Sequence, residues 1–430
     1  MARPTTPHLT AGLLAAAAGA AMVAAATVPA LADGRATAAP AASREHPYGA
    51  HAARGKLVSA EHLGTMSAGK VRAWLASDHF DATSARYGVD TYRLVYRTVD
   101  THRRATTASG LLVLPRNGKR MLRTVSYTHG TMSYKPDAPS TTPDVWGPGA
   151  AITYGSAGFA TVAPDYLGLG RGPGVHPWKD VPSETSASLD MLRAAREFVP
   201  RKGRTLDGRI LVTGFSQGAS SALGLARALQ DGAEPRLRLQ AVAPISGGYD
   251  FRGAELPALL KGRLHPKMSV AYASYLLTSW NRIHGGIYRM PAELFQQPYA
   301  GRVERYFDST TPGEVMLAGL PDTLGELLTP RGFDVLRHPS GTFAQALRVD
   351  GEVCTAWTPR VPVRLYEISK DEQAANANTA HCAAAFKARG VEAPVIDVGD
   401  QTYGGSRHLG SNLSGTALAV RWFTSLNPGR

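Results

Sequence analysis

Cysteines, blocks of basic residues and long apolar segments are all scarce in this chain of 430 residues. Only two cysteines occur, Cys354 and Cys382, and no pair of histidines at the spacing of zinc ligands stands near them. A structural zinc site needs four such ligands. The sequence therefore excludes a zinc site built on these cysteines.

Positive charge is plentiful but is not gathered into blocks. Lysine and arginine number 47 against 34 aspartates and glutamates, which gives a formal net charge of +13. Proteins that bind nucleic acid concentrate basic residues on one face or in runs. Here the arginines are spread along the chain, so we predict a basic, solvated surface and no nucleic-acid partner.

Glycine patterns that bind phosphate are incomplete. The segment GLGRGPG at 168–174 resembles the start of Gly-x-Gly-x-x-Gly, but Pro173 or Val175 stands where the third glycine is required. The chain also lacks the Gly-Lys-Ser/Thr sequence of a phosphate-binding loop. We therefore predict no nucleotide site here, only a loop at the rim of the functional site.

Only one segment is apolar over a long distance, and it lies near the N-terminus. Residues 11–28 are mostly Ala, Leu, Gly, Met and Val, they follow Arg3, and a small-x-small cleavage site ends at Ala32. This pattern predicts a secretory signal peptide over 1–32, cleaved after Ala32, and hence a secreted protein. An uncleaved membrane anchor is the alternative. Residues 33–55, rich in Ala and Pro, are predicted to be a disordered tether.

The predicted secretion indicates the oxidation state of the two cysteines. An exported chain meets oxidising conditions, which favour a disulfide between Cys354 and Cys382 over two free thiols.

Alternating strand and helix patterns describe the rest of the chain. Residues 57–77 have a loosely helical pattern, and 92–98 with 108–114 predict an antiparallel hairpin. Short apolar runs then predict parallel strands buried on both faces, with helices between them. The result is an α/β fold with a mostly parallel, doubly wound sheet. The further strands are expected at 124–127, 159–163, 210–213, 239–245, 361–368 and 394–398, and the helices at 184–198, 219–229, 374–388 and 414–425.

A hundred residues interrupt this alternation at about 249–349. A structureless loop of that length is implausible inside a domain, and the segment is rich in helix formers and aromatics. We predict a mainly helical cap inserted into a catalytic domain that spans 56–430. Tyr272, Tyr275 and Trp280 recur at near-helical spacing and are expected in the core of this cap, whose inner face could also contact substrate.

The segment Gly214-Phe215-Ser216-Gln217-Gly218 stands between a predicted strand and a predicted helix. A serine on such a sharp turn adopts a strained backbone, so small residues are needed two positions before and after it. The hydroxyl is then presented beside a helix N-terminus. This context favours Ser216 as a nucleophile over an ordinary turn residue.

Serine needs a base, and two late histidines are candidates. Only His381 and His408 follow both Ser216 and the strand ending at Ile368. His381 falls within a predicted helix, whereas His408 falls in the glycine-rich GGSRHLG segment, which we interpret as a loop. We therefore prefer His408 as the general base.

The base in turn needs an acid to orient it. Asp371 follows the strand ending at Ile368 and is the preferred residue, with its neighbour Glu372 next. Glu367 is expected within the strand, and Asp250, after the preceding strand, is the other alternative.

Two backbone N–H groups are needed to stabilise an oxyanion. The residue after the nucleophile, Gln217, supplies one. For the other we assign Thr131 in the His129-Gly130-Thr131 turn, with Gly130 next; a simple glycine turn with His129 as a packed loop residue is the alternative.

From Tyr92 to the C-terminus the chain resembles the α/β-hydrolase superfamily, and within it the secreted lipase and esterase branch. The resemblance is carried by the HGT turn at His129, PDYLGLG at 164–170, GFSQG around Ser216, Asp371 after its strand, and the late His408. One departure is EISKDEQ after the acid strand, in place of a small turn containing glycine. The resemblance implies hydrolysis of carboxylic esters, with a cap between the sixth and seventh strands that shapes the substrate pocket.

These observations predict a monomeric serine hydrolase that acts on small-molecule or lipid esters without a metal or organic cofactor, with transient contact of the cap with lipid. One alternative is a secreted aminopeptidase-like amide hydrolase. It would need a carboxylate for the substrate's amine, for which the cap offers Glu255, Glu293, Asp308 and Glu314. The other is a non-catalytic protein that binds lipid or cell wall.

Overall fold

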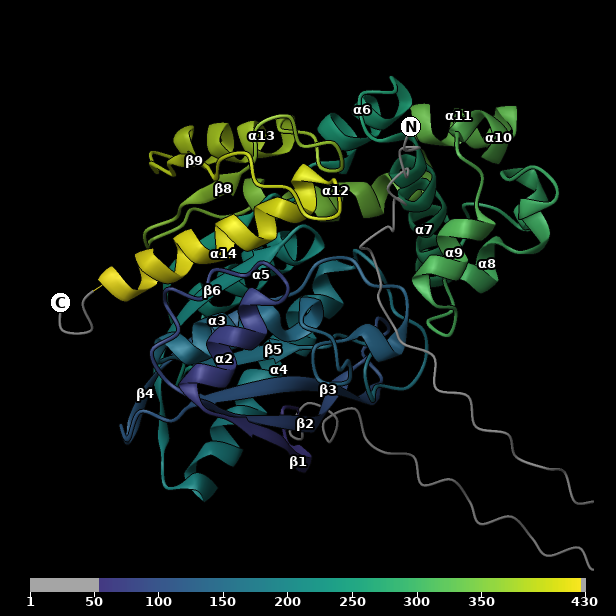
Figure 1. Cartoon of the computed structure of the whole chain (residues 1–430). Helices are drawn as coiled ribbons and strands as arrows, with labels where there is room; N and C mark the ends of the chain where they lie inside the picture. Colours follow the sequence, from purple (N-terminus) through teal and green to yellow (C-terminus); the bar gives the residue numbers. More distant parts are fainter. Residues whose placement is uncertain (1–53, 427–430) are drawn as a thin grey trace, which may run out of the picture.

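The computed structural model describes residues 54–426, which form a nine-stranded sheet covered by helices on both faces (Figure 1). The predicted signal peptide and nearly all of the predicted tether lie outside the described residues. The strands are arranged in the order β1-β2-β3-β5-β4-β6-β7-β8-β9. Their bounds are β1 Leu57–Met66, β2 Val89–Val99, β3 Ala105–Pro115, β4 Met121–Thr128, β5 Ala160–Pro164, β6 Thr205–Phe215, β7 Arg238–Ile245, β8 Leu365–Glu367 and β9 Val395–Asp397.

The sheet has an antiparallel part and a parallel part. β1, β2, β3 and β5 pair antiparallel, whereas β5, β4, β6, β7, β8 and β9 pair parallel in that order. The predicted hairpin of β2 and β3 is confirmed, with Val89 opposite Pro115 and Val99 opposite Ala105. The apolar runs of the parallel strands are buried on both faces, as expected for strands between two helical layers. The predicted mostly parallel, doubly wound α/β sheet is therefore confirmed.

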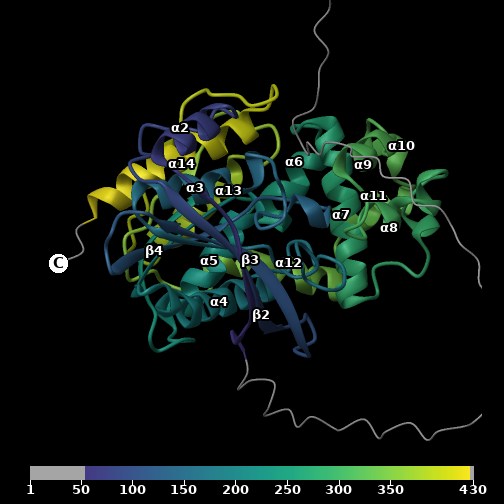
Figure 2. The same cartoon turned by 60° about the horizontal axis from the view of Figure 1, so that its bottom comes forward.

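Helices cover both faces of this sheet (Figure 2). On one face α4 and α5 pack with α12 and α13, and on the other α2, α3 and α14 pack together. Each layer buries its apolar side chains against the strands, which places the two main cores above and below the sheet. The bounds are α2 Ala68–Ala76, α3 Trp146–Ala157, α4 Val181–Phe198, α5 Gln217–Gln230, α12 Gly341–Thr355, α13 Ala377–Lys387 and α14 Arg407–Ser425.

The prediction of helix over residues 57–77 was wrong for the first half. Residues 57–66 form β1, and the helix α2 begins only after Ser67, whose side chain accepts a hydrogen bond from the N–H of Lys70 (3.3 Å). β1 is an edge strand in which only Leu57 is buried. Because the other side chains face solvent, the strand has no apolar alternation, and only its pairing with β2 makes it a strand.

The segment between β7 and β8 is helical and has a hydrophobic core of its own. Its helices α6 to α11 gather at one end of the molecule, on the right of Figure 1. Leu276, Trp280 and Phe295 are buried at the centre of this cluster. No helix within residues 54–426 is long and apolar enough to cross a membrane. The helices not yet defined are α6 Leu256–Leu260, α7 Pro266–His284, α8 Val303–Tyr306, α9 Gly313–Gly319, α10 Leu324–Leu327 and α11 Pro330–Arg337.

The predicted disulfide between Cys354 and Cys382 is present. It joins the end of α12, the last helix before β8, to α13, the first helix after it. Both cysteines are fully buried.

Removing this disulfide should destabilise the protein measurably. The bridge closes a loop with a sequence separation of 28, and a loop of that length restricts the unfolded chain by about 3 kcal/mol. We expect the Cys354→Ala/Cys382→Ala variant to lose about that much free energy of unfolding, measured by urea denaturation. Wild-type protein unfolded in the presence of a reductant is the matched control. A loss below about 1 kcal/mol in both samples would contradict the expectation.

Candidate active site

Ser216 lies on the turn from β6 to α5, in the left-handed region of the backbone with φ of 55°. The two flanking glycines are required by close contacts. A Cβ atom on Gly214 would lie 2.2 Å from the carbonyl oxygen of Gly218, and one on Gly218 would lie 2.0 Å from that of Thr128. The spacing in the sequence therefore reflects a steric requirement of this turn.

His408 lies on α14 and not in a loop, which corrects our interpretation of its segment. α14 begins at Arg407, seven residues before the predicted helix, and Ser406 caps it by accepting a hydrogen bond from the N–H of Leu409 (3.1 Å). Gly410 suggested a loop, but its lack of a side chain serves packing, because a Cβ atom there would lie 1.9 Å from the carbonyl oxygen of Gln401. His408 is thus held on the first turn of a helix.

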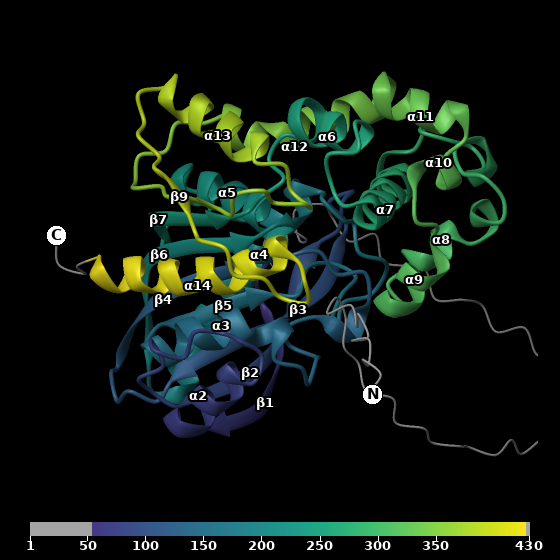
Figure 3. The same cartoon turned by 45° about the horizontal axis from the view of Figure 1, so that its top comes forward.

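Ser216, His408 and Asp371 form one hydrogen-bonded series. The Ser216 hydroxyl donates to His408 Nε2 (2.9 Å), and His408 Nδ1–H donates to Asp371 Oδ2 (2.8 Å). All three residues are buried. Burial lowers the pKa of His408, but the charge and hydrogen bond of Asp371 together with the charges of Glu372 and Glu255 outweigh it, and the net shift is upward from 6.5. The three elements that carry these residues meet at one edge of the sheet (Figure 3).

Asp371 uses its two oxygens differently. Oδ1 accepts hydrogen bonds from the N–H groups of Gln373 and Ala374, both at 2.9 Å, and so holds the turn that follows β8. Oδ2 remains for His408. The carboxylate is therefore held by the backbone that carries it.

Glu372, the other candidate acid on this turn, contacts the backbone N–H of His408 and not its ring. Its carboxylate accepts hydrogen bonds from the hydroxyl of Ser406 and from the N–H groups of Arg407 (3.2 Å) and His408 (3.3 Å). A negative charge at the N-terminus of α14 also interacts favourably with the helix dipole. Glu372 thus anchors the helix, whereas Asp371 holds the imidazole ring.

The remaining alternatives lie elsewhere. Asp250 is paired with His381, with 3.5 Å between Oδ2 and Nδ1, and Glu367 lies on β8 as expected. The structure does not bring His381, Asp250 or Glu367 into hydrogen-bond distance of Ser216.

Gln217 and Thr131, the two predicted oxyanion donors, both border the same small cavity as Ser216. Gln217 is the first residue of α5, so its N–H has no partner inside that helix. The N–H of Thr131 has no acceptor among the described residues, and the hydroxyl of Thr131 accepts a hydrogen bond from Trp178 Nε1 (3.0 Å). Both N–H groups are therefore free to bind a ligand beside Ser216.

Sequence analysis did not identify the residues that hold Gln217. Its side-chain amide donates to Glu184 Oε1 (2.6 Å) and to His176 Nε2 (3.0 Å). Burial lowers the pKa of His176 to about 3 and raises that of Glu184 to about 7. His176 is therefore neutral, and its Nδ1–H donates to the carbonyl of Leu167 (3.0 Å). The sequence did contain a pattern that pointed to burial of Glu184, because Glu184, Ser188 and Met191 recur at helical spacing and lie on the buried face of α4.

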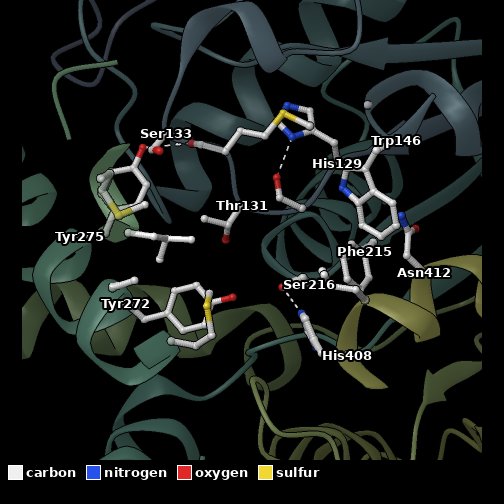
Figure 4. A pocket seen from close by; sticks show the side chains of 18 of the residues that line it. His129, Thr131, Ser133, Trp146, Phe215, Ser216, Tyr272, Tyr275, His408 and Asn412 are labelled. Carbon is white, nitrogen blue, oxygen red and sulfur yellow. Dashed lines mark hydrogen bonds between the residues drawn. The ribbon is translucent and has the colours of Figure 1, made fainter. Parts of the chain in front are cut away.

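A largely apolar pocket of about 750 Å³, including its open mouth, lies above Ser216 (Figure 4). Tyr272 and Tyr275 project into it from α7 at one end, and Trp146 and Asn412 border the other end. Both tyrosines thus contact the site, whereas Trp280 is buried in the core of the insertion. Further apolar lining comes from Met132, Phe215, Met268, Phe307, Met316 and Leu317.

The glycine-rich segment 168–174 does not border the site, contrary to our expectation of a rim loop. None of its residues lines the apolar pocket or the small cavity beside Gln217. Gly170 packs against the buried Asp165 side chain, where a Cβ atom would lie 2.2 Å from Oδ2. The segment is therefore structural, and it is Trp178 and Lys179, just after it, that reach the small cavity.

Comparison with known proteins gives structural neighbours only. No protein-family model matches this sequence, and no protein with a curated functional description matches it. Among solved structures, the rice cell wall degrading esterase LipA from Xanthomonas oryzae is 24% identical, with a TM-score of 0.75 over 87% of this chain and 98% of the esterase. Candida antarctica lipase A in its closed state is 14% identical, with a TM-score of 0.56 over 83% of this chain and 81% of the lipase.

The predicted resemblance to α/β-hydrolases is confirmed at the level of the fold. The chain has a mostly parallel sheet of nine strands with helices on both faces, and its structural neighbours include an esterase and a lipase. We conclude that this protein has the α/β-hydrolase fold found in solved esterases and lipases.

Proposed function

We propose that this protein is a secreted serine hydrolase that cleaves carboxylic esters. The observation that supports it most is the series of hydrogen bonds from Ser216 through His408 to Asp371, at the base of an apolar pocket. A serine hydroxyl with a histidine at 2.9 Å, itself held by a buried carboxylate, has the components needed for acyl transfer.

In the proposed mechanism, Ser216 Oγ attacks the ester carbonyl carbon while His408 Nε2 accepts its proton. Asp371 keeps the imidazole in the tautomer that leaves Nε2 free, and stabilises the imidazolium that forms. His408 then donates the proton to the leaving alkoxide, which departs as the alcohol. Water, deprotonated by His408, attacks the acyl-enzyme and releases the acid.

The developing negative charge on the carbonyl oxygen would be stabilised by the N–H groups of Gln217 and Thr131. Because Gln217 is held by Glu184 and His176, its N–H is oriented before the substrate binds. No metal or organic cofactor is needed for these steps.

Secretion is part of the proposal. It is supported by the predicted signal peptide and by the disulfide between Cys354 and Cys382, since disulfides persist in oxidising compartments. We expect the protein to act as a monomer on small-molecule or lipid esters.

A fluorophosphonate probe tests the assignment of the nucleophile. We expect mass spectrometry of the labelled protein to find the probe on Ser216 alone, because within residues 54–426 it is the only serine whose hydroxyl is hydrogen-bonded to a histidine ring. The His408→Ala variant should label at least a hundredfold more slowly. Labelling of another serine, or an unchanged rate in the histidine variant, would contradict the proposal.

A second candidate is amide hydrolysis with the same machinery. One observation favours it: of the four carboxylates that could hold a substrate amine, Glu255 borders the small cavity beside Ser216. Glu293, Asp308 and Glu314 line neither cavity. Comparing turnover of a p-nitrophenyl ester with that of an aminoacyl p-nitroanilide separates the two candidates.

A further inference from the structure

Ser216 borders a second cavity, which we call the small lobe. Its volume is about 300 Å³, including its open mouth, and it is lined by Ser216, Thr131, Gln217, Trp178, Tyr272 and Glu255, among others. Ser216, Thr131 and Tyr272 also line the larger apolar pocket. The two cavities therefore meet at the nucleophile, and a bound ester can extend into both.

Glu255 brings a carboxylate to the wall of the small lobe. The residue is only 3% exposed, and its Oε2 accepts hydrogen bonds from Asn378 Nδ2 (2.6 Å) and from the N–H of Ala375 (3.0 Å). Its Oε1 has no hydrogen-bond partner within residues 54–426. Burial raises the pKa of Glu255 to about 7. Because Glu255 lines the small lobe, a hydrogen-bond donor on a molecule bound there can pair with this oxygen.

Lys179, the lysine that lines the small lobe, is not the partner of Glu255. Its ammonium group is 2.9 Å from Asp350 Oδ1 and donates to Ser220 Oγ (2.9 Å) and to the carbonyl of Gly248 (2.8 Å). The ion pair and the two hydrogen bonds already engage this ammonium group. The lysine therefore closes the lobe and leaves Glu255 as the acceptor for a ligand.

The position of His408 indicates which part of an ester enters the small lobe. The leaving oxygen must lie within reach of His408 Nε2 to receive its proton, and His408 lines the apolar pocket but not the small lobe. Thr131 and Gln217, whose N–H groups would hold the carbonyl oxygen, border the small lobe. This arrangement directs the alcohol part into the apolar pocket and the acyl part into the small lobe.

We propose, resting on the ester hydrolysis proposed above, that the enzyme prefers esters of short acids that carry a hydrogen-bond donor, with Glu255 Oε1 as its acceptor. A hydroxyl group and an ammonium group are the two donors that fit this chemistry. The aromatic rings of Trp178 and Tyr272, stacked with centroids 5.9 Å apart, form an apolar wall around the carbon atoms of the acyl group.

Two series of hexyl esters with acyl groups of equal size test the proposal at pH 7. In the first series, hexyl L-alaninate and hexyl L-lactate carry an ammonium or a hydroxyl group where hexyl isobutyrate has a methyl group. In the second, hexyl β-alaninate and hexyl 3-hydroxypropanoate carry these groups one carbon further from the carbonyl, and hexyl butanoate is their reference. In each series we measure kcat/KM by titrating the released acid. The Glu255→Gln variant is the comparison, because its carbonyl oxygen can keep the bonds to Ala375 and Asn378 while an NH₂ donor replaces Oε1.

In the wild-type enzyme, kcat/KM of at least one ester with a donor should exceed that of its isostere by about tenfold or more. This ratio is first divided by the ratio of the alkaline hydrolysis rates of the two esters, which removes their difference in intrinsic reactivity. In the variant this preference should fall to about one. Effects of the substitution on catalysis cancel in the ratio. Preference for ammonium alone identifies aminoacyl esters, and preference for hydroxyl alone identifies hydroxyacyl esters.

Three results would overturn the inference while leaving ester hydrolysis intact. The first two are a wild-type preference near one in both series, and a preference that is unchanged in Glu255→Gln. The third is a donor preference found only on the alcohol side, seen when 2-hydroxyethyl isobutyrate is compared with propyl isobutyrate. If the variant does not fold, judged by circular dichroism, the wild-type ratios decide. Absence of hydrolysis of every ester would instead reject the proposed function itself.

Discussion

Replacing Ser216 with alanine is expected to lower kcat for a p-nitrophenyl ester by about 10⁵ to 10⁶, to the level supplied by binding and the backbone N–H groups alone. The hydroxyl is the proposed nucleophile, and within residues 54–426 it is the only hydroxyl hydrogen-bonded to His408 Nε2. The His408→Ala variant should lose a similar factor, since members of one catalytic unit do not act additively. Release of p-nitrophenol, followed by absorbance, measures both.

The matched control for the histidine is His381→Ala. His381 is the other late histidine, pairs with Asp250, and does not line either cavity. We expect its kcat to stay within about twofold of wild type. A Ser216→Ala protein that retains more than about one per cent of wild-type activity would contradict the assignment, as would equal losses in the two histidine variants.

Asp371→Asn should lower kcat by about 10⁴, because a side-chain amide no longer stabilises the imidazolium and can present its NH₂ to His408. The turn should survive, since the amide oxygen can still accept from the N–H groups of Gln373 and Ala374. Glu372→Gln is the comparison: its contacts are with Ser406 and with the backbone of α14, so we expect its loss to be at least a hundredfold smaller. Equal losses would indicate that Glu372 and Asp371 share the role.

The pH profile gives a second readout for the same variants. His408 must be neutral to act as a base. Burial lowers its pKa, but the charge and hydrogen bond of Asp371, with the charges of Glu372 and Glu255, together raise it above 6.5. Activity of the wild type should therefore fall as the pH drops through a value above 6.5. In Asp371→Asn the protonated imidazole loses this stabilisation while burial remains, so the acid limb of kcat/KM should move to lower pH. A limb that does not move would contradict the role of Asp371.

Much of the fold was predictable because its signals are local. Short apolar runs identified the parallel strands, and the Gly-x-Ser-x-Gly turn between β6 and α5 follows from contacts within a few residues and with the neighbouring strand β4. β1 escaped prediction because an edge strand with exposed side chains has no periodic pattern. The start of α14 was misplaced because glycine suggests a loop, whereas Gly410 is needed for contact with a distant backbone.

For the site, chain order narrowed the choice of acid and base but could not describe how they are held. Nothing local to Glu372 indicates that it anchors the helix bearing His408, because the two residues are 36 positions apart. The same holds for how Glu184 and His176 hold Gln217, and for Glu255, whose neighbours in the lobe come from five other parts of the chain.

The sequence by itself thus determined the class of fold, the disulfide and the residues worth testing, since each depends on residue type, order and spacing. Only the tertiary structure decided which histidine and carboxylate lie beside Ser216, and which of the four candidate carboxylates of the insertion lines a cavity together with Ser216. The physical reason is that hydrogen bonds and cavities depend on distances between side chains on separate elements, and these distances exist only once the sheet and the insertion have packed.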